Sequence, residues 1–290
     1  MTITSTLPGG AWTLGEQRVP RFGLGTMQLA GPGVMGPPAD RAAAVELVRE
    51  AVALGVTHLD TSGAYGPHVV NEIVREAVQG ASQDVLVATK VGADRDADGG
   101  WPTARTPEDL RRQVHENLTS LGVERLDLVH LRMGDATGPR AESLVEPFEA
   151  LVAMQREGLV RDVGLSNVTR EQVAQARDIA PVVSVQNLYN LAQRDDDDLV
   201  DELAADGIAY VPFFPLGGFS PLQADALSAV ARRRGSTPRA VALAWLLRRS
   251  PNILLIPGTS RLEHLRANVA GAELVLSDDD VAELDGIGTR

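Results

Sequence analysis

The chain contains no cysteine and only one lysine. Without cysteine, disulfides and thiolate metal sites are excluded across all 290 residues. The lysine is Lys90, and the other 26 cationic residues are arginines. So strong a bias toward arginine raises the question of what position 90 requires that arginine does not supply.

Long apolar runs and excess positive charge are missing as well. No stretch approaches the roughly 18–20 apolar residues of a membrane span, and the N-terminal segment lacks the basic and apolar regions of a secretory signal. The formal net charge of −12 suits neither nucleic acid nor anionic membranes, so we expect no such partners. The lack of cysteine fits a reducing compartment, so we expect a cytoplasmic protein. No long amphipathic extension argues for assembly, so we expect a monomer.

The motifs of several common enzyme classes are incomplete. The Rossmann fingerprint fails at Gln28, which stands at its third glycine position, and the serine-hydrolase elbow fails at Val168. His115 precedes a glutamate, but no second histidine completes a zinc motif. The run 195–198 is all aspartate, yet it lacks the glycine and glutamate of a calcium loop. We read that run as a solvated helix start and expect no bound metal.

Eight short apolar runs alternate with longer helical stretches. The runs cover residues 21–26, 56–60, 84–90, 125–131, 160–166, 182–187, 208–213 and 252–258. They are nearly continuous instead of alternating, which is typical of a parallel sheet covered on both faces. Eight strand–helix units predict an α/β fold, a (β/α)8 TIM barrel that spans residues 1–290 as a single domain. A doubly wound sheet is the competing architecture, and the incomplete Rossmann fingerprint disfavours it.

Helices are expected between these strands, with capping residues at their starts. One follows Asp40, and the others cover residues 69–78, 107–121, 141–157, 169–178, 195–205, 223–234, 237–248 and 261–269. The candidate N-caps are Asp40, Thr106, Thr169, Ser236 and Ser260. Residues 11–20 read as a short β-hairpin, which we expect to close the bottom of the barrel.

Four polar residues stand at or just after the ends of neighbouring predicted strands, where the catalytic groups of a barrel lie. They are Asp60, Tyr65, Lys90 and His130. An ammonium lowers the pKa of a nearby phenol, a carboxylate holds the ammonium in place, and a histidine can hydrogen-bond a substrate oxygen. This set predicts that Tyr65 is a general acid toward a developing alkoxide. A compact lysine suits position 90 better than a planar, forked arginine. Taken singly, each of these residues is more often structural than catalytic.

Motifs along nearly the whole chain resemble those of the aldo-keto reductases. They are GLGTMQL (23–29), GVTHLDTSGAYGPHVVNEIVREAV (55–78), VATKVG (87–92), LDLVHL (126–131), VGLSNV (163–168), VQNLYN (185–190) and IPGTSRLEHLRANVAG (256–271). The resemblance implies a barrel that reduces aldehydes and ketones with NADPH and a tetrad of Asp60, Tyr65, Lys90 and His130. Within the family, MQLAGPGVMGPP and DTSGAYGPHVVNEIVREA resemble bacterial pyridoxal reductases, which implies reduction of pyridoxal to pyridoxine.

The resemblance also implies where NADPH or NADP+ binds. Ser166, Asn167 and Gln186 would hold the nicotinamide carboxamide, because hydroxyl and amide groups suit its donors and acceptors. Phe213 would stack on the nicotinamide ring, where the family more often has tyrosine. Leu216, Gly217 and Gly218 would face the pyrophosphate, Gly258, Thr259, Ser260 and Arg261 the 2′-phosphate, and His264 and Asn268 the adenine end. Some relatives carry lysine near this phosphate site, and this chain does not. Arg261 therefore carries most of the expected preference for NADPH over NADH.

The substrate pocket is the least readable part of the site. Position in the rim loops suggests Met27, Trp101, Arg132, Met133 and Phe214. The long loop 92–106 is rich in glycine and aspartate, and it is either a lid over the site or a plain surface loop. Three alternatives stay open: a different carbonyl or imine substrate, alcohol oxidation as the working direction, and a non-catalytic NADPH-binding regulatory subunit.

Overall fold

The computed structural model describes residues 7–135, 138–217 and 225–287, and its central sheet has seven parallel strands. In chain order these are β3 (Leu24–Gly25), β4 (His58–Asp60), β5 (Leu86–Val91), β6 (Leu126–Arg132), β7 (Val160–Ser166), β8 (Ser184–Gln186) and β9 (Ala209–Tyr210). Each strand pairs with the next one along the chain, so the sheet curls in sequence order. The run predicted at 160–166 matches β7, whereas the other strands are shorter or shifted.

Residues 252–258, predicted as the eighth strand, close the barrel through isolated bridges instead of a continuous ladder. Ile253 bridges to Tyr210, Leu255 to Phe22 and Gly258 to Gly25, all in parallel orientation. Pro257 has no amide hydrogen and interrupts the ladder. At Gly25 a Cβ would lie only 2.5 Å from the carbonyl oxygen of Ile256, so this close approach requires glycine. The predicted barrel is confirmed, but a regular eighth strand is wrong.

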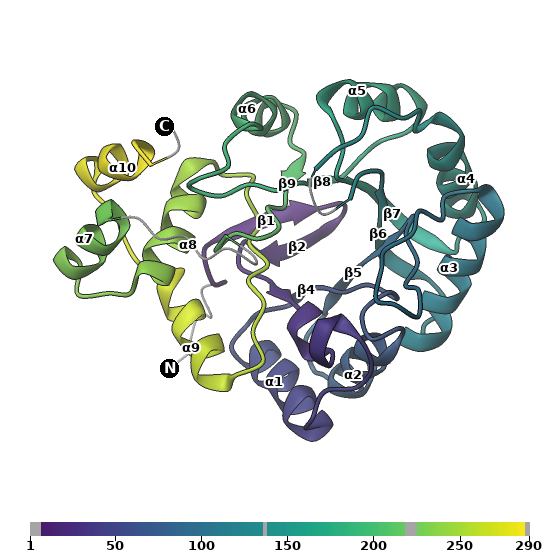
Figure 1. The fold of residues 1–290 in the computed structure, drawn as a ribbon, viewed down its shortest axis with the longest axis horizontal. Helices are drawn as coiled ribbons and strands as arrows, with labels where there is room; N and C mark the ends of the chain where they lie inside the picture. The colour runs from purple at the N-terminus through teal and green to yellow at the C-terminus, as the bar shows by residue number, and fades with distance from the viewer. Residues whose placement is uncertain (1–6, 136–137, 218–224, 288–290) are drawn as a thin grey trace.

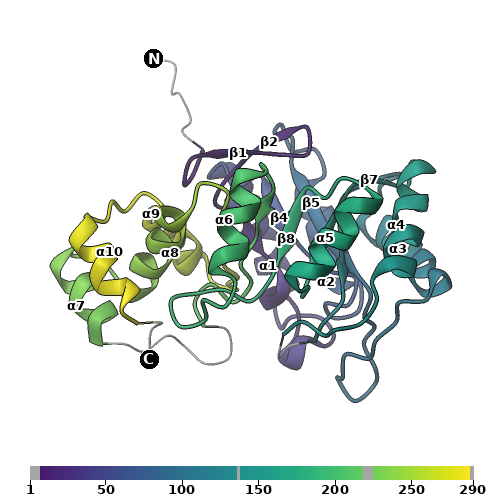
Figure 2. The ribbon, with the colours of Figure 1, turned by 90° about the horizontal axis from the view of Figure 1, so that it is seen from above.

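An N-terminal hairpin of β1 (Ala11–Leu14) and β2 (Gln17–Pro20) covers one end of the barrel (Figure 2). Leu14 and Val19 are buried among side chains of the barrel interior, such as Leu86 and Leu254. The Gln17 amide also donates to the carbonyl oxygen of Asp84, just before β5 begins. The hairpin therefore plugs the end where the strands start, as predicted, and leaves the opposite end open for chemistry.

Helices surround the sheet (Figure 1). They are α1 (Arg41–Ala53), α2 (Val69–Val78), α3 (Pro107–Leu121), α4 (Val145–Arg156), α5 (Arg170–Ile179), α6 (Asp197–Ala205), α7 (Asp225–Arg233), α8 (Pro238–Arg249), α9 (Leu262–Gly271) and α10 (Asp278–Asp285), with two 3-10 turns, Met27–Leu29 and Pro32–Val34. The predicted ranges 69–78 and 107–121 match α2 and α3. The helix predicted from residue 141 begins later, at Val145.

Three of the five predicted caps are confirmed. The Asp40 carboxylate accepts from the Ala43 amide, and Thr106 and Thr169 each form a reciprocal capping box. Two predicted caps are wrong. Thr237 caps α8 in place of Ser236, because Pro238 takes the first helical position. Arg261 stands at the N-cap of α9 in place of Ser260 and makes no side-chain cap.

The last described helix, α10, was not predicted from the sequence. Ser277 and Asp280 form its capping box, a signal present in the run SDDD. Asp280 is buried and accepts from Arg233 of α7 at 2.7 Å, and this ion pair fastens α10 to α7. No helix was predicted here because the segment is strongly acidic, and the stability of α10 depends on that tertiary contact.

Two further features concern only the part of the chain that the structure describes. There, no helix is both long and apolar enough to cross a bilayer. The same residues also include no cluster of three histidine, aspartate or glutamate side chains placed to bind a metal ion.

Candidate active site

Lys90 and Asp60 form an ion pair at the ends of β5 and β4. The Lys90 ammonium donates to Asp60 Oδ1 at 2.6 Å and to the Thr61 carbonyl oxygen at 3.0 Å. Burial alone would lower the pKa of Lys90, but the Asp60 carboxylate and the Tyr65 hydroxyl outweigh it and raise that pKa above its ordinary value. Lys90 is therefore held as a fixed cation.

The second oxygen of Asp60 is held from the far side of the barrel. The Gln186 amide on β8 donates to Asp60 Oδ2 at 2.9 Å. Asp60 is thus fixed through both oxygens, by Lys90 on one side and by Gln186 on the other. A carboxylate anchored in this way holds the ammonium in one position.

Tyr65 lies against this pair in the turn that follows β4. Its ring centroid is 5.3 Å from the Lys90 ammonium, and its side chain is largely buried. The Trp101 ring meets it edge-on, with centroids 6.2 Å apart and planes at 81°. Trp101 belongs to the loop 92–106, so this loop packs directly onto the predicted general acid.

His130 occupies a deeper position than the sequence suggested. Its Nε2 lies 2.8 Å from the Ser184 hydroxyl, and the residue is 1% exposed. Burial lowers the pKa of His130 to about 3, with the Lys90 charge acting in the same direction, so the imidazole is neutral near pH 7. No role was predicted for Ser184, although it precedes Gln186 by two residues on the same face of the strand.

The residues predicted for the nicotinamide carboxamide form a cradle that fits it. Ser166, Asn167 and Gln186 are all buried at the ends of β7 and β8. Asn167 Oδ1 and Gln186 Oε1 are buried acceptors without a hydrogen-bond partner among the described residues. Two unpartnered acceptors match the amide hydrogens of a carboxamide, which donates two hydrogen bonds. This part of the chain therefore suits NADPH.

The next predicted cofactor contacts follow β9. Phe213 is half-buried and meets the Phe214 ring edge-on, with centroids 5.3 Å apart. Leu216 and Gly217 follow in a turn, and Gly217 has a positive φ of 90°. An aromatic face and a glycine turn suit a ring and a pyrophosphate respectively. The prediction for Gly218 lies outside the described residues.

The predicted phosphate site is the start of α9. The Thr259 hydroxyl accepts from the Arg261 amide at 3.1 Å, while Ser260 is exposed. Arg261 is also exposed, and its guanidinium lies 2.6 Å from Glu263 Oε1. A solvent-facing arginine at a helix N-terminus can reach a phosphate, although Glu263 competes for it.

The remaining predicted cofactor contacts, His264 and Asn268, lie further along α9 and differ in exposure. The His264 imidazole is 37% exposed and lies 3.6 Å from Glu263 Oε1. Asn268 is buried, with 2% of its surface exposed. Gly258, at the other edge of this site, takes part in the barrel closure opposite Gly25.

The residues predicted for the substrate pocket are divided between the rim and the core. Trp101 and Arg132 lie together, with the guanidinium carbon 5.5 Å from the Trp101 ring centroid. Met27 is half-buried in the first 3-10 turn, and Phe214 has a φ of 52° beside Phe213. Met133 is buried, and its carbonyl oxygen and sulfur both accept from Arg105.

The loop 92–106 is held in place over the rim. Ala93 and Thr103 form a β-bridge across its base. Arg95 packs on the Trp101 ring with its guanidinium carbon 4.1 Å from the centroid, and it donates to the Gly33 carbonyl oxygen at 2.7 Å. These contacts favour a docked cover over an unattached surface loop.

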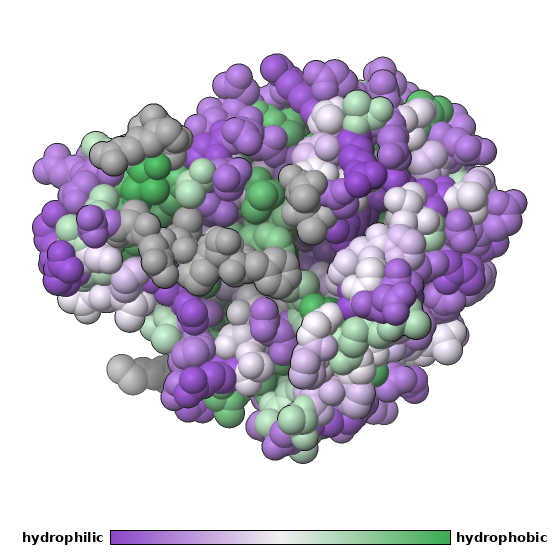
Figure 3. Space-filling view, viewed as in Figure 1, coloured by the Kyte–Doolittle hydropathy of each residue, from purple (hydrophilic) through white to green (hydrophobic). Residues whose placement is uncertain are grey.

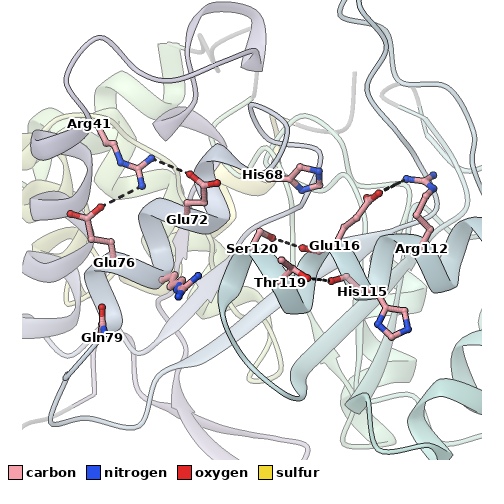
Figure 4. A pocket seen from close by; sticks show the side chains of 11 residues that line it. Arg41, His68, Glu72, Glu76, Gln79, Arg112, His115, Glu116, Thr119 and Ser120 are labelled. Atoms are coloured by element: carbon pink, nitrogen blue, oxygen red, sulfur yellow. Dashed lines mark hydrogen bonds and ion pairs between the residues drawn. The ribbon is translucent and has the colours of Figure 1, made fainter.

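Two cavities lie beside the barrel mouth or outside it. A groove of about 770 Å³ runs between α2 and α3, lined by charged side chains such as Arg41, Glu72 and Glu76 (Figure 4). Arg41 already pairs with both glutamates, at 3.6 and 3.4 Å. A smaller cavity of about 220 Å³ reaches Lys90 from the α3 side.

Viewed from the side of Figure 1, hydrophilic side chains cover most of the periphery, and apolar ones gather toward the middle (Figure 3).

Comparison with known proteins agrees with this fold. The aldo/keto reductase family model matches residues 21–289. Pyridoxine 4-dehydrogenase of Escherichia coli is 56% identical over 97% of this chain and 99% of its own. An uncharacterized oxidoreductase of Schizosaccharomyces pombe is 36% identical over 96% of this chain and 90% of its own. A Klebsiella pneumoniae aldo-keto reductase solved with NADPH superposes with a TM-score of 0.79 at 28% identity, covering 95% and 94% of the two chains. The chain belongs to the aldo/keto reductase family.

Proposed function

We propose that this protein reduces an aldehyde to an alcohol with NADPH, and that pyridoxal is its substrate. The observation that carries the proposal is the buried Lys90–Asp60 pair packed against the Tyr65 ring. The relative at 56% identity is named as a pyridoxine 4-dehydrogenase, which acts on the same alcohol–aldehyde couple. The NADPH-bound relative and the two open acceptors of Asn167 and Gln186 support the cofactor.

Four residues of the chain take separate roles in the reduction. NADPH, when bound, supplies a hydride to the carbonyl carbon and leaves as NADP+. Tyr65 donates a proton to the carbonyl oxygen as the C=O π bond breaks, so that one C–H and one O–H bond form. Lys90 stabilises the resulting phenolate through its fixed charge, and Asp60 keeps that charge in place. Trp101 and the docked loop exclude water from the reacting atoms.

A substrate panel tests the proposal. The purified protein would be mixed with NADPH and with pyridoxal, benzaldehyde or acetone, and the loss of absorbance at the NADPH band followed. We expect turnover with aldehydes and the highest kcat/KM with pyridoxal, and pyridoxine with NADP+ should run the reaction in reverse. Tight NADPH binding without consumption of any carbonyl compound would point instead to a regulatory subunit.

A further inference from the structure

Arg132 lies at the same depth in the barrel as Ser166 and Gln186, two of the residues predicted to bind the nicotinamide carboxamide. Strand register pairs Arg132 with Ser166, and Ser166 with Gln186, so three neighbouring strands present these residues in one rung. His130 pairs with Gly164 one rung lower, two residues deeper in the barrel. Residues two apart on a strand share a face, so Arg132 and His130 both point inward but reach different depths.

The Arg132 guanidinium lies near Tyr65, the predicted general acid, and one of its N–H donors has no hydrogen-bond partner among the described residues. Its carbon lies 5.5 Å from the Trp101 ring centroid, and Trp101 meets Tyr65 edge-on. Arg132 Nε is buried and has no hydrogen-bond partner among the described residues, and the charge of Asp135 acts on the guanidinium. A buried N–H without a partner needs an acceptor, and the described residues supply none to Arg132 Nε.

His130, by contrast, is already engaged. Its Nε2 lies at hydrogen-bonding distance from Ser184, and its ring packs so closely on Gly164 that a Cβ there would lie 2.7 Å from Cδ2. The ring is therefore locked below the rung that holds the nicotinamide cradle. Its Nδ1 has no hydrogen-bond partner among the described residues, but His130 lies one rung below Arg132 and Ser166.

We propose that Arg132 donates to the substrate carbonyl oxygen opposite Tyr65, and that its fork also binds an oxygen on the neighbouring ring carbon. Two N–H groups of a guanidinium are spaced to grip two adjacent oxygens at once. Pyridoxal carries a hydroxyl next to its aldehyde, so this inference deepens the proposed function and rests on it. Arg132 stabilises negative charge on the oxygen while hydride is added to the carbon.

Two aldehydes that differ by a single hydroxyl test whether the Arg132 guanidinium binds two adjacent oxygens at once. The kcat/KM with NADPH would be compared for benzaldehyde and 2-hydroxybenzaldehyde in the wild-type, Arg132→Met, Arg132→Lys and His130→Gln proteins. Loss of one such donor lowers rates by about 100-fold or more. We expect that loss with benzaldehyde in Arg132→Met, a larger loss with 2-hydroxybenzaldehyde, and less than about tenfold loss in His130→Gln. A greater loss in His130→Gln than in Arg132→Met, or equal losses of Arg132→Met with both aldehydes, would overturn the proposal.

Binding without turnover gives a second readout. Pyridoxal affinity would be measured by tryptophan fluorescence on the NADP+-loaded protein, which has no hydride to transfer. Arg132→Met should bind pyridoxal at least tenfold more weakly and still bind NADP+, whereas an unchanged pyridoxal affinity would contradict the proposal. If Arg132→Met fails to fold, Arg132→Lys replaces it, because it keeps the charge and loses the fork. A wild-type protein that consumes no NADPH with any aldehyde would refute the proposed function, and this binding comparison would still test Arg132.

Discussion

Lys90 and Asp60 form the only ion pair among the described residues in which both side chains are at most 10% exposed. Pairs of this kind are sensitive to the loss of one partner, because the charge that remains is buried and uncompensated, at a cost of roughly 3–5 kcal/mol. Such pairs are equally sensitive to a change in the shape of either side chain. The single lysine of the chain therefore stands where charge and geometry are both constrained.

Replacing Lys90 with arginine tests that constraint directly. The Lys90→Arg protein keeps its positive charge, but a planar guanidinium cannot occupy the point from which Nζ reaches Asp60 at 2.6 Å and Thr61 at 3.0 Å. We expect kcat for aldehyde reduction to fall by about 100-fold, the range for impaired general acid catalysis. Steady-state kinetics with NADPH and pyridoxal provide the measurement, with Lys90→Met as the variant that loses the charge as well. Near-normal turnover in Lys90→Arg would show that position 90 needs only a cation.

Removal of the Tyr65 hydroxyl separates chemistry from binding. The Tyr65→Phe side chain retains the ring that packs on Trp101 and near Lys90, so the pocket should keep its shape. Loss of the proton donor should lower kcat by about 100-fold or more. NADPH affinity, followed by quenching of protein fluorescence, should change little. Turnover close to that of the wild type would remove Tyr65 from the role of general acid.

Local sequence signals were enough to predict much of the fold. Helices α2 and α3 and strand β7 have the predicted bounds, because apolar periodicity, caps and glycines all mark the same limits there. The bridges at 252–258 were not predictable, since a proline and close contacts between distant segments decide that pairing. Helix α10 was missed because the contact of Asp280 with Arg233 supports it, and sequence periodicity does not show that contact.

The sequence predicts which residues form the site, but not how deep in the barrel each of them lies. The two-residue periodicity of a strand places His130 and Arg132 on one face. Which of them reaches the rim depends on the register with β7, where Ser166 pairs with Arg132. Register is set by packing between strands, so a single sequence cannot show it. The neutral state of His130 follows from that same depth.

Cofactor preference should depend on Arg261. The Arg261→Ala protein loses the exposed guanidinium at the start of α9, which is the candidate partner of the 2′-phosphate. A hydrogen bond to a charged group contributes about 1.5–3 kcal/mol, so KM for NADPH should rise by roughly 10- to 100-fold while KM for NADH changes little. Glu263→Gln is the matched variant, since it frees Arg261 from its 2.6 Å partner and should lower KM for NADPH. Equal effects of Arg261→Ala on both cofactors would argue against a 2′-phosphate site.

Acid should destabilise the fold partly through His130. The pKa of His130 is lowered to about 3 by burial, so between that value and the ordinary value near 6.5 the unfolded chain binds a proton that the folded protein does not. Stability contributed by the neutral ring is therefore complete above pH 6.5 and declines as the pH falls, by about 2 kcal/mol between pH 7 and pH 5.

The His130→Gln variant isolates this contribution. Glutamine keeps an acceptor and a donor near Ser184 but does not titrate, so its free energy of unfolding should fall less between pH 7 and pH 5 than that of the wild type, by about 2 kcal/mol. His58, whose pKa burial lowers to about 4, remains in both proteins and cancels in the comparison. Urea unfolding at the two pH values gives the difference. Parallel losses in both proteins would mean that His130 takes up its proton without unfolding, and that the ring is less confined than its contact with Ser184 indicates.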